Sequence, residues 1–282
     1  MPPGTPYNSF VKPYPIRVDE FSVPRDGSLT VAALHLLTHT HSDHIIGLNS
    51  KSFGSIIICS EDAKEMLLRH ETYQARFLRE EDYVYEKQRT FEHLKFPMQA
   101  SNEVFKRNEF DLIKEAVSGL IDLMKAYPVH MRFFINVWTW GYEDILKAVS
   151  QAFESKIHVD RYKNDVYSSL SDRDLRALIT QDYRSTRFHA CERFARCDLV
   201  RNEDPGVVYI NPVNISSDNW DLYLAKTKAM MERGALPMLL LVPLHRHSTL
   251  PELQNFVGLF RPRRLVPNFL EPSLHGLDWA CM

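Results

Sequence analysis

The chain has 282 residues, of which 44% are hydrophobic and 11% aromatic, and its 34 Lys and Arg against 36 Asp and Glu give a formal charge of −2. This composition predicts a globular protein with one large core or two smaller ones, and it excludes a disordered chain or a strongly basic nucleic-acid coat. No apolar run is long enough to cross a bilayer, so we expect no membrane partner.

The cysteines and histidines point to metal chemistry. Four cysteines at 59, 191, 197 and 281 are too few and too unevenly spaced for a disulfide framework, which indicates a reducing compartment. The chain has 12 histidines, and three of them fall within residues 39–44.

The predicted elements alternate along the chain. The proline-rich first 15 residues are expected to form an extended arm. Apolar runs at 29–38 and 55–59 predict buried strands, and Ser60 as N-cap predicts a helix that continues beyond Tyr73. We then expect helices at 109–126, 142–153, 171–179, 218–233 and 250–259, and strands at 131–138, 156–159, 207–210, 237–244 and 263–267. This alternation predicts the α/β class with largely buried strands.

A histidine-rich loop follows the first predicted strand. His39, His41, Asp43 and His44 form the pattern H-x-H-x-D-H. His39 and His41 would project the same way on an extended loop and share one zinc ion, while Asp43 and His44 could face a second. Such a pair could activate water for attack on a phosphate ester. The alternative is a turn of solvated histidines.

These residues resemble a known family. The sequence HTHSDH, followed by IIGL at 45–48 and a strand ending in CSE at 59–61, is similar to the metallo-β-lactamase fold in its nucleic-acid-processing branch. PIRVDEF at 15–21 is similar to the opening strand of the Artemis-like DNA cross-link repair nucleases, with Asp19 at their first acidic position. Segments at 118–149, 156–163, 186–197 and 244–267 resemble, in order, the β-CASP region and the returning end of the lactamase domain.

The resemblance implies a specific domain organisation and active site. The expected fold is a partial αββα metallo-β-lactamase sandwich over 1–105 and 236–282, with an inserted β-CASP α/β domain over 106–235. It implies catalytic roles for Asp43 and for His247, which is similar to the late active-site histidine of the family. A nuclear location, DNA as a partner, and contacts with proteins of repair complexes are further expectations.

A second group of metal ligands is predicted in the later half. His189 and Cys191 form H-x-C, Cys197 follows six residues later, and His158 lies on a short predicted strand. Two imidazoles and two thiolates suit a closed, structural zinc site. The resemblance implies the same four ligands, because Artemis-like nucleases carry a His2Cys2 zinc in this region. The alternative is a buried cysteine beside surface histidines.

Two metal motifs of the family do not occur in this chain. One is an Asn-His-Cys-Pro-Gly-like turn, and the other is a Thr-Gly-Asp-like turn with its following Asp-Thr strand motif. The resemblance therefore leaves two functions open. The first is a zinc-dependent deoxyribonuclease, an exonuclease or structure-selective endonuclease of cross-link or double-strand-break repair. The second is a catalytically incomplete relative that binds DNA or a repair partner. An RNA-processing relative is a third, less favoured, alternative.

Local basic groups are candidates for phosphate contacts, since backbone contacts dominate DNA affinity. They include Arg161, Lys163, Arg184 and Arg187. The alternative for each is a solvated charge at a helix end.

Overall fold

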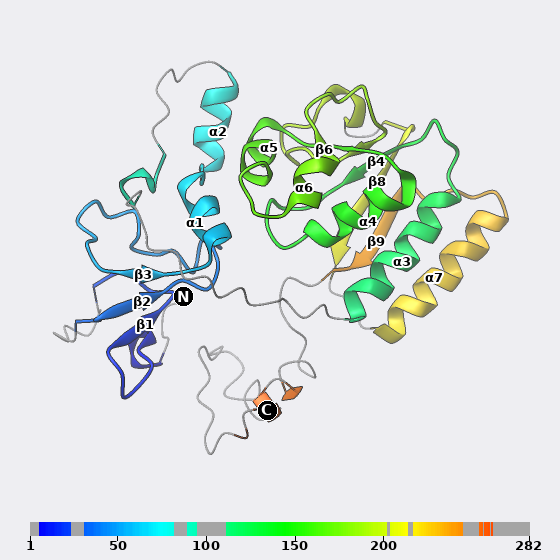
Figure 1. Cartoon of the computed structure of the whole chain (residues 1–282). Coiled ribbons are helices and arrows are strands. Elements are labelled where there is room, and N and C mark those ends of the chain that lie inside the picture. The colour runs from blue at the N-terminus through cyan, green and yellow to red at the C-terminus, as the bar shows by residue number, and fades with distance from the viewer. Residues whose placement is uncertain are drawn as a thin grey trace. The chain divides into compact units, whose positions relative to one another are not determined.

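The structure is a computed structural model, and it describes residues 6–23, 31–81, 89–94, 111–201, 204–213, 217–244, 254–255, 257–259 and 261. The chain divides into two compact units, Met1–Gln99 with Thr249–Met282, and Ala100–Ser248. The α/β prediction is confirmed, because each unit combines helices with a parallel sheet (Figure 1). Among the described residues, no helix is both long and apolar enough to span a bilayer.

The first unit is built on a small parallel sheet. Its strands are β1 (Ile16–Val18), β2 (Leu34–Leu36) and β3 (Ile57–Ile58), in that order. A 3-10 helix η1 (Pro6–Ser9) precedes β1, so the expected extended arm is partly helical. The buried core of this unit includes Phe21, Leu37, Ile45, Leu48, Leu67 and Phe91. This core holds both ends of the histidine-rich loop, since Leu37 and Ile45 flank it.

The helix predicted from Ser60 is split in two. Ser60 does cap α1 (Glu61–Leu68), because its side chain accepts a hydrogen bond from the Ala63 N–H. A second helix, α2 (Tyr73–Glu80), begins separately, because the Thr72 hydroxyl accepts from the Ala75 N–H. The sequence therefore contains a second N-cap where one continuous helix was expected. A short 3-10 helix, η2 (Glu92–Leu94), follows.

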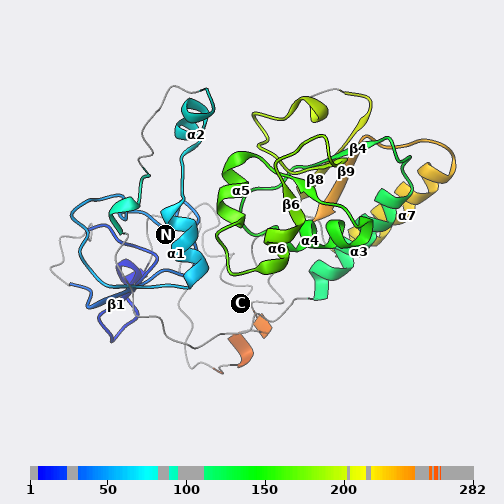
Figure 2. The same ribbon diagram turned by 45° about the horizontal axis from the view of Figure 1, so that its top comes forward.

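The second unit is a six-stranded parallel sheet with helices packed against it. The strand order is β6-β5-β7-β4-β8-β9. The strands are β4 (Arg132–Ile135), β5 (Ile157–His158), β6 (Ile179–Thr180), β7 (Phe188–His189), β8 (Val207–Val213) and β9 (Leu239–Pro243). The helices are α3 (Asp111–Lys125), α4 (Glu143–Phe153), α5 (Arg161–Tyr167), α6 (Arg173–Leu178), the 3-10 helix η3 (Asp198–Val200) and α7 (Ser217–Glu232). In Figures 1 and 2, α3 and α7 lie side by side.

The centre of this sheet is mainly apolar. Phe133, Phe134 and Ile135 of β4 have no exposed surface, and Phe133 stacks on Phe188 of β7. Because all six strands are parallel, their carboxyl ends meet at one edge of the sheet, where ligands of open α/β sheets bind. The residues that follow β4, β5, β6 and β7 therefore gather at this edge.

Some boundaries differ from those expected. The strand predicted at 237–244 is β9, which pairs with β8 and so belongs to the second unit, whereas the expected lactamase segment began at 236. Strands β6 and β7 were not predicted, because β6 begins at the end of the helix predicted at 171–179 and β7 lies in a largely polar segment. The strand expected at 263–267 lies outside the described residues.

Helix α6 begins at a charged cap that gives a pH-dependent contribution to stability. The Asp172 carboxylate accepts from the Leu175 N–H and pairs with Lys147 of α4. Partial burial raises the pKa of Asp172, but the bonds from Lys147 and Leu175 outweigh it, so the pKa lies below its usual value.

We expect Asp172→Ala to destabilise the folded chain by about 1 kcal/mol at pH 7. A lowered pKa means that the stabilisation is present above the carboxyl's unfolded pKa and is lost as the pH falls through its folded pKa. Urea unfolding at pH 7 and pH 3 should show a difference between wild type and variant that shrinks at acid pH. Asp174→Ala, on the same helix, is the control, and an equal pH-dependent loss in that control would contradict the assignment.

Candidate metal centres

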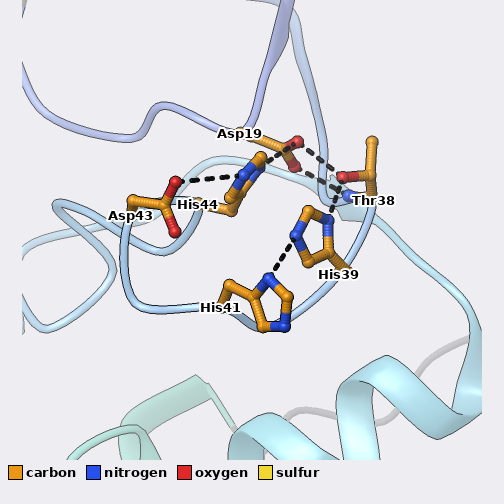
Figure 3. Close-up of polar contacts among 6 residues, drawn as sticks. All are labelled: Asp19, Thr38, His39, His41, Asp43 and His44. Atoms are coloured by element: carbon orange, nitrogen blue, oxygen red, sulfur yellow. Dashed lines mark hydrogen bonds and ion pairs between the residues drawn. The ribbon is translucent and has the colours of Figure 1, made fainter. Parts of the chain in front are cut away.

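The histidine-rich loop is tied to the end of β1 by Asp19 (Figure 3). The Thr38 N–H donates to Asp19 Oδ1 over 2.7 Å, and the Thr38 hydroxyl donates to Oδ2 over 2.6 Å. The His44 Nδ1 lies 2.8 Å from the same Oδ2. Asp19 is only 2% exposed and adopts a left-handed backbone with φ of 52°, a conformation that aspartate tolerates better than most residues. One carboxylate therefore fixes both ends of the loop.

The imidazoles of the loop converge beside Asp19, and the residues expected to pair lie in contact. The ligand atoms of Asp19, His39 and His44 all lie within 4.8 Å of one another. His41 is at the rim, with its Nδ1 3.0 Å from the His39 Nε2, and Asp43 Oδ2 is 3.3 Å from the His44 Nε2. The pattern predicted His39 with His41 and Asp43 with His44. The structure keeps both pairs in contact and also brings His39 and His44 together beside Asp19, to which the His44 ring is hydrogen-bonded.

The charge on Asp19 is favoured by its partners. Burial is the largest influence and raises the pKa of this carboxyl, but the hydrogen bonds from His44 and Thr38 together outweigh it. The net pKa is below the usual value, so Asp19 is ionised at neutral pH. An ionised carboxylate and two imidazoles are donors that a divalent zinc ion prefers.

The second predicted cluster comes together at the carboxyl edge of the large sheet. His158 ends β5 and pairs in register with His189 at the end of β7. The ligand atoms of His158, Cys191 and Cys197 lie within 4.8 Å of one another. The His189 Nδ1 contacts two of these groups, at 3.2 Å from the His158 Nδ1 and 3.4 Å from the Cys197 Sγ. The four residues named from the sequence therefore form one cluster.

The spacing within this cluster fits a tetrahedral ion. Zinc bonds of 2.0–2.1 Å to nitrogen and about 2.3 Å to sulfur place two nitrogens about 3.3 Å apart, and a nitrogen and a sulfur about 3.6 Å apart. The distances of 3.2 and 3.4 Å are close to these values. His189 is fully buried, and its Nε2 has no hydrogen-bond partner within the part of the chain that the structure describes.

The electrostatics of the cluster favour unprotonated imidazole. Burial, with the neighbouring His158 and Arg132, lowers the pKa of His189 to about 4. The hydrogen bond between the two thiols lowers the pKa of Cys197 to about 7 and, with burial, raises that of Cys191. A neutral imidazole and an accessible thiolate are the forms in which these side chains bind metal.

Two basic residues predicted to contact phosphate make contacts within the protein itself. Lys163 is 2% exposed, and its Nζ donates to the carbonyls of Val137 and Ala190 over 2.7 Å each. The Arg187 guanidinium packs over the rings of three phenylalanines, at 133, 153 and 188. The interpretation of Lys163 as a phosphate contact is wrong, because its ammonium group is buried and donates hydrogen bonds to these two main-chain carbonyls.

Lys163 joins the ends of β4 and β7 directly before Trp138 and Cys191. We expect Lys163→Met to destabilise the chain by about 2 to 3 kcal/mol, because it leaves two buried carbonyls without a donor. Chemical denaturation measures this loss, and Lys156→Met at an exposed site should change stability by no more than about 0.5 kcal/mol. Equal losses in the two variants would contradict a role for Lys163 at the strand ends.

His247, the second residue expected to be catalytic, lies outside the described residues. Asp19, Thr38 and Lys163 could not be assigned their contacts from spacing, because each acts between segments that only the sheets bring together. Neither the models of known protein families nor the curated proteins include a match to this chain.

Proposed function

We propose that the chain is a zinc-binding relative of the DNA cross-link repair nucleases and hydrolyses nucleic-acid phosphodiesters at the loop of residues 38–44. The observation that carries this proposal is the convergence of Asp19, His39 and His44 within 4.8 Å directly after a strand. The His2Cys2 cluster supports the same family, because its four ligands match the family's motif. The αββα sandwich, the β-CASP insertion and the nuclear location are part of this proposal.

The donor set at the loop suits a catalytic metal better than a structural one. His39, His44 and Asp19 would hold the ion, and His41 and Asp43 stand at the rim of the site. The histidines at 39 and 44 are each partly exposed, so the site is open to a substrate. Zinc in an open site polarises phosphate oxygens and makes bound water acidic.

The side chains around the loop have separate tasks. Asp19 and Thr38 orient the ring of His44 and the backbone of the loop through the hydrogen bonds described above. Asp43 is exposed at the rim, where its carboxylate can accept a proton from an attacking water. His41 can hold or donate a proton at its Nε2, since its Nδ1 faces His39.

A second candidate function is binding of nucleic acid without cleavage. It is favoured by the absence from the sequence of the two further metal motifs that complete the site in the family. A single ion at the loop, without a bridging carboxylate for a second ion, would lack the two-ion clamp on the attacking and leaving oxygens.

Cleavage of a 5′-phosphorylated single-stranded DNA by the purified, zinc-loaded chain tests the proposal. We expect cleavage that stops when zinc is removed and returns when zinc is restored. Binding of the same DNA without any cleavage would overturn the enzymatic function and leave the second candidate. The double variant His39→Ala and His44→Ala serves as the control for a contaminating nuclease.

A further inference from the structure

Exposed aromatic rings and arginines alternate along the carboxyl edge of the six-stranded sheet. Trp138 follows β4 and is 47% exposed, and Phe194, in the loop after β7, is 66% exposed. The Arg193 guanidinium lies over both rings, 5.5 Å from the Trp138 centroid and 5.0 Å from the Phe194 centroid. Two rings and a cation from different segments are therefore held together at the surface.

A second pair of the same kind lies on the other side of the His2Cys2 cluster. The exposed Arg184 packs over Tyr183, 5.3 Å from its centroid, in the turn that follows β6. The Tyr183 ring is 6.0 Å from the ring of His158. Strands β6 and β4 are three positions apart in the sheet order, which corresponds to about 14 Å. The two pairs thus flank the metal cluster along one edge.

The fold holds the loop between Cys191 and Cys197 in a defined position. Both of its ends belong to the metal cluster. Inside the loop, Arg196 packs over Phe134 and Tyr209, at 4.3 and 5.2 Å, which attaches it to the sheet. Lys163 fixes the strand ends just before Trp138 and Cys191. The exposed rings are therefore presented on a rigid base, which reduces the entropy lost when a ligand binds.

We infer that this edge, defined by Trp138, Tyr183, Arg184, Arg193 and Phe194, is a stacking surface for single-stranded nucleic acid. Aromatic rings stack on bases of any sequence, and interleaved arginines attract the phosphates and stack as well. The loop carries two arginines against one acid, Glu192, so its local charge is positive. The inference rests on the proposed function in one respect, because that function supplies nucleic acid as the substrate.

Fluorescence anisotropy with a labelled oligothymidylate of about 15 nucleotides tests the inference, on the full zinc-loaded chain carrying His44→Ala to prevent cleavage. We expect Trp138→Ala and Phe194→Ala each to weaken binding about fivefold or more, because one stacking ring is lost. Trp138→Phe should retain most of the affinity, since it keeps a ring. Arg176→Ala, an exposed arginine on α6, and Leu222→Ala, an exposed apolar residue on α7, are matched controls and should change affinity by less than about twofold.

The outcomes separate this inference from the proposed function. Weaker single-strand binding in the ring variants with unchanged duplex binding supports the surface, whether or not the chain cleaves DNA. If the ring variants bind like wild type, the stacking surface is overturned. It is also overturned if Arg193→Ala and Arg176→Ala weaken binding equally, because the arginines then attract the phosphates wherever they lie on the surface. If the chain does not bind the oligonucleotide at all, the inference is also overturned, and a protein partner would then explain the exposed rings. Binding as expected without cleavage in the unmodified chain would contradict the proposed function alone.

Discussion

Replacing Cys191 by serine is expected to remove one zinc ion per chain and to destabilise the second unit by about 4 to 6 kcal/mol. Cys191 is 2% exposed and packs with Phe134, Val200 and Val207 in the core. Its thiolate is a ligand that a hydroxyl replaces poorly, and the other three donors would remain buried without a cation. With about 2 to 4 °C per kcal/mol for a unit of this size, the melting temperature should fall by roughly 10 to 20 °C.

Calorimetry and elemental analysis on the same preparation measure both effects. Cys59→Ser is the matched control, because Cys59 is half-buried in the first unit and belongs to neither metal cluster. That control should keep its zinc. A Cys191→Ser chain that retains the wild-type zinc content would contradict the His2Cys2 site. A fall in stability alone would not support the site, because a packing defect in the core also lowers the melting temperature.

Replacing His44 by alanine is expected to lower the rate of DNA cleavage by about a hundredfold or more and to remove the metal of the loop. His44 is both a member of the loop cluster and the hydrogen-bond partner of Asp19. Its loss removes one ligand and leaves the Asp19 carboxylate without the bond that orients it. The cluster of the second unit shares no residue with the loop and should keep its zinc.

Steady-state cleavage of 5′-phosphorylated single-stranded DNA measures the effect, together with the zinc content of the variant. His130→Ala is the control, because His130 is exposed before β4 and lies in neither cluster. A His44→Ala chain that cleaves at the wild-type rate would show that any hydrolysis takes place away from this loop.

Long apolar runs were sufficient to predict most of the second unit. Strands β4, β8 and β9 and helices α4 and α7 lie where the pattern placed them. The three strands and α4 each bury several apolar side chains, whereas the buried side chains described for α7 are Trp220 and Thr227. The short strands β6 and β7 were missed for a physical reason. Strand β6 begins at the end of the helix predicted at 171–179, and β7 lies in a largely polar segment, so neither stands out as a separate apolar run.

The sequence predicted which residues belong to the candidate sites better than it predicted how those residues are arranged. Sequence spacing named all four residues of the His2Cys2 cluster, which the sheet then brings together at its edge. The grouping of His39 with His44 depends on Asp19, whose position follows from the parallel pairing of β1 with β2. Lys163 has an ordinary sequence context, and only the approach of two strand ends explains its buried charge.

Zinc content of the purified full chain, measured for wild type, for Cys191→Ser and for His44→Ala, tests the central claim that two separate clusters each hold a metal ion. We predict about two zinc ions in wild type and about one in each single variant, with the remaining ion in the cluster that was left intact. No zinc in wild type, or an unchanged content in both variants, would contradict it.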